Sequence, residues 1–201
     1  PEAFTEVRYL AHVRQLEVLR ILPRLAGELH RAVGRRIRAV SPYRCEGADT
    51  VVVALGSVLG TLKDTVDALR GDGTRIGVLG LTAFRPFPFA EVATALADTS
   101  RVIVLERAFA TGVGGIVTGD VRAAAPEIPV HTVVAGLGGR PVTSASLRSM
   151  LLDAVTGGLE PLTFLDLDRR VVDRELARAA ATRRSGPTAE NLLLSIRGGR
   201  R

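Results

Sequence analysis

Cysteine is scarce in this chain of 201 residues, which contains only Cys45. A single thiol cannot form an internal disulfide, and an iron–sulfur cluster usually takes four thiolates. So few cysteines are typical of a reducing compartment, and we expect a cytoplasmic protein. His12, His30 and His131 share no metal-ligand spacing with one another or with Cys45, so the sequence predicts no metal centre.

Long apolar runs are also lacking. Charges or glycines interrupt every apolar stretch before it reaches the roughly 20 residues of a membrane-spanning helix. No basic stretch followed by an apolar core stands at the N-terminus, so no signal peptide is predicted. A start at Pro1 is expected of a fragment or a processed chain. With 46% hydrophobic and 24% charged residues, the composition is that of a globular protein with one sizeable core.

Aromatic residues are few: two tyrosines, six phenylalanines and no tryptophan. They offer little surface on which nucleic-acid bases could stack. Positive charge is abundant at one end alone, because residues 169–201 hold nine arginines and three acidic side chains and so account for the whole net charge of +6. Such a tail can contact phosphates, which keeps a basic-tailed nucleic-acid-binding protein as one alternative. The low aromatic content disfavours it.

Apolar strand patterns alternate with helical patterns through the middle of the chain. The expected strands are 51–55, 75–81, 102–105 and 130–135. The expected helices are one through Leu62, Val66 and Leu69 that Gly71 ends, and those near 90–97, 116–124 and 144–155. Continuous apolar strands that alternate with helices imply a mostly parallel sheet covered on both faces. The predicted fold class is therefore α/β, a three-layer αβα sandwich.

Two segments flank this core. Apolar residues recur every three or four positions over 10–33, which predicts an amphipathic helix that Pro23 should kink or split and Gly34 should end. After the core, residues 171–181 and 190–196 show short helical patterns. We divide the chain into an N-terminal helical connector (1–45), an α/β domain (46–158) and an Arg-rich C-terminal extension (159–201).

The glycine-rich turns do not match nucleotide-binding motifs. In the turn that begins at Gly56, Lys63 lies three residues beyond Gly60, too far into the helix for a triphosphate loop. No turn completes the G-x-G-x-x-G pattern of dinucleotide-binding proteins. Small residues at tight turns explain these sequences most simply. The alternative is an anion site at the helix N-terminus, for which the candidates are Gly56, Ser57, Gly60 and Thr61.

Polar residues that follow the strands are candidates for an interface. In an open α/β sheet, ligands gather at the carboxyl ends of the strands, where Glu106 and Arg107 stand. A local salt bridge or an interface contact is favoured over chemistry for this pair. No serine or cysteine is readable beside a histidine, so no catalytic residue is predicted.

The order of the turn sequences is more informative than any one turn. Val53-Ala54-Leu55-Gly56-Ser57, Phe84-Arg85-Pro86-Phe87-Pro88, Glu106-Arg107-Ala108 and Gly136-Leu137-Gly138-Gly139-Arg140-Pro141-Val142-Thr143 follow one another. This series resembles the C-terminal, transketolase-C-terminal-like domain of the α subunit of pyruvate and related 2-oxoacid:ferredoxin oxidoreductases. The resemblance runs from about Phe4 to Asp166.

The resemblance implies a parent reaction that this chain cannot complete alone. Those enzymes use thiamine diphosphate, coenzyme A and iron–sulfur clusters to oxidise a 2-oxoacid to an acyl-CoA, with electrons passing to ferredoxin. The implied partners are pyrimidine-binding, pyrophosphate-binding and cluster-bearing domains or subunits. We therefore expect a structural domain that binds no cofactor alone, with Arg85, Glu106, Arg107 and Arg140 as interface candidates. A related alternative is the C-terminal domain of a 2-oxoacid dehydrogenase or transketolase-type enzyme.

Overall fold

The computed structural model describes residues 2–182, which form two units that divide after Leu165. The first unit contains a six-stranded sheet with the order β1-β3-β2-β4-β5-β6. Only β1 runs antiparallel to its neighbour, β3, and every other pair is parallel. The strands are β1 (Val40–Tyr43), β2 (Thr50–Leu55), β3 (Ile76–Leu81), β4 (Arg101–Glu106), β5 (Val130–Val134) and β6 (Leu162–Phe164).

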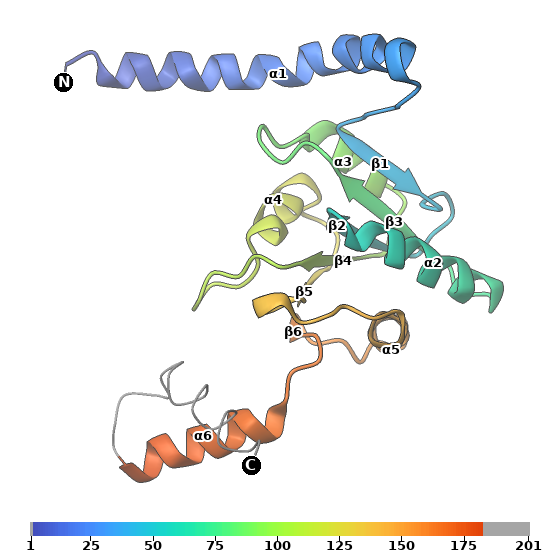
Figure 1. Ribbon diagram of the computed structural model, residues 1–201, viewed down its shortest axis with the longest axis vertical. Coiled ribbons are helices and arrows are strands. Elements are labelled where there is room, and N and C mark those ends of the chain that lie inside the picture. The colour runs from blue at the N-terminus through green and yellow to red at the C-terminus, as the bar shows by residue number, and fades with distance from the viewer. Residues whose placement is uncertain (1, 183–201) are drawn as a thin grey trace. The chain divides into compact units, whose positions relative to one another are not determined.

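Helices cover both faces of this sheet (Figure 1). The four covering helices are α2 (Val58–Gly71), α3 (Phe89–Leu96), α4 (Ile116–Ala124) and α5 (Ser144–Val155). Helices α2 and α5 pack together on one face, and α3 and α4 pack together on the other. The prediction of a three-layer αβα sandwich with a mostly parallel sheet is confirmed.

Strand β2 shows why the central strands read as unbroken apolar runs. Val52 and Ala54 join the core under α2 and α5, whereas Val51 and Val53 join the core under α3 and α4. Successive side chains of a strand point to opposite faces, so a strand buried on both faces must be apolar at every position. All four side chains are buried.

Both outermost strands lie outside the predicted α/β core of residues 46–158. Strand β1 has four residues and contains Pro42, which suits an edge strand because proline donates no ladder hydrogen bond. The chain after β1 approaches β3 so closely that a Cβ atom on Gly77 would lie 2.6 Å from the Arg44 carbonyl oxygen. Strand β6 has only three residues.

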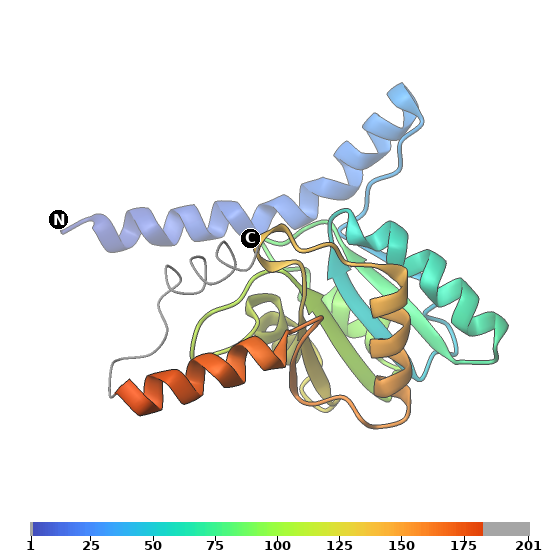
Figure 2. The same cartoon turned by 60° about the horizontal axis from the view of Figure 1, so that its bottom comes forward.

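Helix α1 (Phe4–Val33) precedes the sheet and lies outside the three layers (Figure 1). It continues through Pro23, so the proline does not split it, but the helix bends in its C-terminal half and its end turns away from the sheet (Figure 2). Gly34 ends it as predicted, in the left-handed conformation with φ of 72°, and its N–H donates to the His30 carbonyl. No residue of α1 is buried.

The second unit begins with α6 (Arg169–Thr182), which contains the predicted helical pattern of 171–181. The Asp168 carboxylate caps it by accepting hydrogen bonds from the backbone N–H groups of Arg170 and Val171. The helical pattern predicted at 190–196 and the last arginines of the basic tail lie outside the described residues. Over residues 2–182, no helix combines the length and apolarity needed to cross a membrane.

Candidate functional site at the carboxyl edge of the sheet

The parallel strands end at one edge of the sheet, where a cavity of about 530 Å³ opens between the turns that follow β2, β4 and β5. Four of the predicted site residues line it: Gly56, Ser57, Glu106 and Arg107. The other four, Gly60, Thr61, Arg85 and Arg140, are not part of its lining. The structure therefore brings half of the predicted set together at this edge of the sheet.

Glu106 is buried, and its carboxylate accepts four hydrogen bonds from α4. Oε2 accepts from the backbone N–H of Ile116 at 2.9 Å and of Val117 at 2.8 Å, and Oε1 accepts from the N–H of Thr118 at 3.0 Å and its hydroxyl at 2.8 Å. The Thr132 hydroxyl donates in turn to the Thr118 hydroxyl. The end of β4 thus caps the N-terminus of α4, where donors are unpaired and a negative charge is favoured.

Gly115 makes this cap possible. A Cβ atom at this position would lie 2.0 Å from the Oε1 atom of Glu106, so any larger residue would displace the carboxylate. The loop between β4 and α4 is also closed by two backbone hydrogen bonds that join Ala110 and Gly114. Between them Val113 is 85% exposed. The buried cap and the closed loop hold an apolar side chain out from the edge of the sheet.

Arg107 is the cationic member of the cavity lining. It is exposed and makes no ion pair with its neighbour Glu106, whose carboxylate is directed at α4 instead. Its guanidinium lies against the backbone at Gly136, where a Cβ atom would come within 3.3 Å of Nε. Because α4 compensates the charge of Glu106, Arg107 gives the mouth of the cavity a positive charge.

The N-terminus of α2 offers fewer free donors than the sequence suggested. The N–H groups of Leu59 and Gly60 already donate to the carbonyls of Gly56 and Ser57, at 3.2 and 3.3 Å. Ser57 makes no side-chain cap. Gly56 has φ of 84°, a left-handed conformation that favours glycine, so the tight turn itself accounts for that residue. The anion site at Gly56, Ser57, Gly60 and Thr61 stays a prediction.

Arg85, in the turn after β3, contacts both α4 and α1. Its guanidinium pairs with Asp120 of α4 at 2.9 Å and lies 4.1 Å from the centroid of the Phe84 ring. Its carbonyl accepts a hydrogen bond from the Gln15 side chain of α1 at 3.1 Å. Arg140 follows the short 3₁₀ helix η1 (Leu137–Gly139) in the turn after β5.

The chain's donor set does not fit an iron–sulfur cluster. Cys45 is its only thiol, and burial raises the pKa of this thiol, which disfavours the thiolate that a cluster requires. The Cys45 thiol lies 3.2 Å from the Val78 carbonyl oxygen, to which it donates. Within the described part of the chain, no three His, Cys, Asp or Glu side chains are grouped so that they could hold a metal ion.

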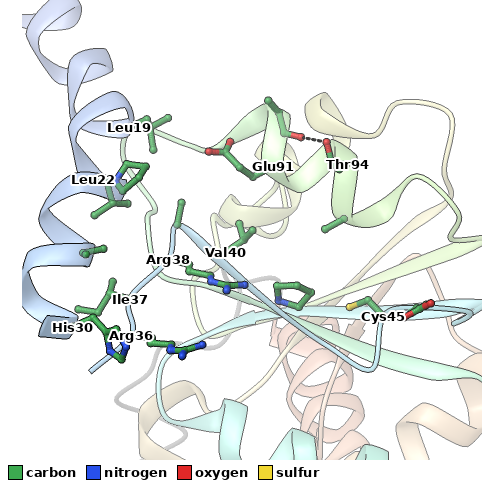
Figure 3. Close-up of a pocket in the computed structure, with 18 of the residues that line it drawn as sticks. Leu19, Leu22, His30, Arg36, Ile37, Arg38, Val40, Cys45, Glu91 and Thr94 are labelled. Carbon is green, nitrogen blue, oxygen red and sulfur yellow. Dashed lines mark hydrogen bonds between the residues drawn. The ribbon is translucent and has the colours of Figure 1, made fainter. Parts of the chain in front are cut away.

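A second, larger cavity of about 990 Å³ lies between α1 and its own domain (Figure 3). Leu19, Leu22 and His30 of α1 line one side, and Val40, Glu91 and Thr94 lie on the other. The Nδ1 atom of His30 is buried and makes no hydrogen bond with the described residues. Sequence reasoning missed this cavity, because helical periodicity shows that a helix has an apolar side but not how closely that side packs.

Comparisons with known proteins point to the same family that the order of the turn sequences resembles. Residues 48–147 match the family model described as pyruvate:ferredoxin oxidoreductase core domain II. Two curated relatives carry the name pyruvate synthase subunit PorA. The protein of Methanothermobacter thermautotrophicus is 33% identical over 75% of this chain and 39% of its own length. That of Thermotoga maritima is 36% identical over 75% of this chain and 41% of its own length.

A solved structure is also similar. The 2-oxoglutarate:ferredoxin oxidoreductase of Magnetococcus marinus aligns with 59% of this chain and 20% of its own, at 21% identity and a TM-score of 0.49. The chain thus spans about 40% of the length of the curated relatives it matches.

Proposed function

Because the chain belongs, through residues 48–147, to the pyruvate:ferredoxin oxidoreductase core domain II family, we propose that it is the structural and assembly domain of a 2-oxoacid:ferredoxin oxidoreductase α subunit. The observation that carries this proposal is the match to pyruvate synthase subunits over 75% of the chain at 33% and 36% identity. The parent reaction is the oxidative decarboxylation of a 2-oxoacid to an acyl-CoA, with electron transfer to ferredoxin, in the cytoplasm.

Pyruvate is the substrate we propose for the parent enzyme, since the relatives matched at 33% and 36% identity are named for pyruvate. A ketoisovalerate oxidoreductase subunit, VorA of Pyrococcus horikoshii, is 28% identical over 76% of this chain. Branched 2-oxoacids are therefore the substrates to compare with pyruvate in an assay.

The residues at the carboxyl edge fall into two groups, one that stabilises this domain and one that is exposed to other proteins. Glu106, the buried acid at the carboxyl edge, is engaged by four hydrogen bonds within the domain and so serves the fold. Arg107 and Val113 of the loop that follows β4 are exposed and can meet another protein surface. We assign thiamine diphosphate, coenzyme A and the clusters to other domains or subunits, and Arg85, Arg107 and Arg140 to contacts within the assembly.

The test is to isolate the native complex that contains this chain and to compare it with the chain alone. We expect the complex to contain thiamine diphosphate and iron and to reduce a dye when pyruvate and coenzyme A are supplied. The chain alone should do neither. A native complex with no 2-oxoacid-dependent activity, or an isolated chain that is active by itself, would overturn the proposal.

A further inference from the structure

Helix α1 presents an apolar stripe to solvent. Val18, Ile21, Leu25 and Leu29 are spaced by three or four residues and therefore share one face of the helix. Their exposed fractions are 40%, 41%, 47% and 36%. Exposed apolar side chains that adjoin one another on the surface of a protein commonly mark a site of contact with another molecule, and we read the stripe in this way.

The adjoining face of α1 is directed at its own domain but does not pack closely against it. Leu19, Leu22, Ala26 and His30 line the cavity of about 990 Å³ that separates the helix from β1 and α3 (Figure 3). None of the four stripe residues lines this cavity. Close-packed interiors leave few voids larger than a water molecule, so the domain's own core does not account for the position of α1.

The bend of α1 indicates where its other contact lies. Pro23 lines the cavity, and a proline bends a helix away from its own side. Ile21 and Leu25 are each two residues from Pro23, about 200° round the helix, so they lie on the inside of the bend. Figure 2 shows the end of α1 turning away from the sheet. Helices normally curve around the core that they cover, so the concave side of α1, which carries Ile21 and Leu25, is the side shaped to fit against another surface.

The charge of α1 indicates which kind of surface could bind to its apolar stripe. Helix α1 contains five arginines and three glutamates, which gives it a net charge of +2. Two copies of α1 packed through their stripes would bring like charges together, whereas a surface rimmed by carboxylates would be attracted. A bent helix also fits a rounded surface better than a second bent helix.

We propose that α1 docks, through the stripe of Val18, Ile21, Leu25 and Leu29, on a second folded domain of the same oxidoreductase that lies outside this chain. The docking surface of that domain is convex and apolar and carries carboxylates at its rim. This inference rests on the proposed function, under which about 60% of the parent subunit's length is outside this chain, as the curated relatives indicate.

Hydrogen exchange in the isolated chain and in the native complex tests the docking. We expect the amides of residues 18–29 to exchange at least about 100-fold more slowly in the complex. The double variant Ile21→Glu/Leu25→Glu, introduced into the complex, should lose that protection, because it places two charges in an apolar contact. Leu152→Glu on α5, at a side chain that is 39% exposed, is the matched control and should keep it.

Two outcomes would overturn the docking. One is equal exchange of residues 18–29 in the active complex and the isolated chain. The other is a dimer of the isolated chain, seen by light scattering, that Ile21→Glu/Leu25→Glu dissociates, since α1 would then pair with a second copy. Either result leaves the proposed function standing. That proposal fails separately if the native complex has no 2-oxoacid-dependent activity.

Discussion

At the scale of the residue, Glu106 is the buried charge on which the carboxyl edge depends. Replacing it by glutamine keeps its size but turns an amide NH₂ group toward the donors of α4. We expect Glu106→Gln to lower the free energy of unfolding by about 1.5–3 kcal/mol, because the bonds that are lost are charge-assisted. Urea denaturation measures this. The control, Glu91→Gln at an exposed position of α3, should be nearly neutral, and equal stability of the two variants would contradict the cap.

Tyr43 provides a second test at this scale. Its hydroxyl donates to Asp67 at 2.6 Å, and this hydrogen bond is the main cause of a raised pKa of the phenol. Ionisation of Tyr43 is therefore resisted in the folded state. The stability that this hydrogen bond gives to the folded state is fully present below about pH 10, the ordinary pKa of tyrosine. It is lost as the pH rises through the higher pKa that Tyr43 has in the folded state.

Ultraviolet titration of Tyr9→Phe, which leaves Tyr43 as the only tyrosine, should therefore give a midpoint above 10. Adding Asp67→Ala should lower the midpoint. A titration curve that is the same with and without Asp67 would show that the bond is absent in solution.

At the scale of the element, two glycines of α4 distinguish close contact from helix propensity. Gly115, the N-cap, has no room for a methyl group, whereas a Cβ atom on Gly119 meets nothing within 4 Å. We expect Gly115→Ala to destabilise the domain by about 1–3 kcal/mol through displacement of Glu106. Gly119→Ala should stabilise it by up to about 1 kcal/mol, because alanine favours a helix more than glycine does. Thermal unfolding of the two variants should shift in opposite directions.

Prediction from sequence worked best for the elements that the core specifies. Strands β2 to β5 were predicted because each is buried on both faces and so must be apolar throughout. Strand β1 was missed because it is a short edge strand with a proline, and β6 because three residues carry no period. Alternation along the chain therefore predicted the three layers but not the edges of the sheet.

The site was predicted less completely than the fold. That Glu106 ends a strand could be read from the chain, but its partners lie ten to twelve residues later and form a helix end whose N–H groups carry no sequence signal. The charge of Arg107 was evident, and its place beside Gly136 was not. Both facts depend on how β4 and β5 pair, which the sequence alone does not give.

At the scale of the whole molecule, Arg107 separates assembly from folding. No hydrogen bond or ion pair joins its side chain to the residues described, so Arg107→Ala should leave the unfolding temperature of the chain unchanged within about 1 °C. In the native complex it should weaken association, with an effect that fades at high salt. Arg148→Ala, which removes the exposed pair with Asp72, is the control. A complex that is indifferent to Arg107→Ala at low salt would remove this residue from the interface.

The order of the strands has a consequence for any attempt to shorten the chain. A fragment cut to residues 46–158, the α/β domain predicted from the sequence, would lose β1 and β6 but keep all four covering helices. Strands β3 and β5 would then become bare edges whose unpaired N–H and C=O groups invite other chains to add on. We expect that fragment to aggregate on expression, whereas residues 38–166 should remain monodisperse by light scattering. Strands β1 and β6 therefore end the sheet on its two sides and prevent other molecules from pairing with β3 and β5.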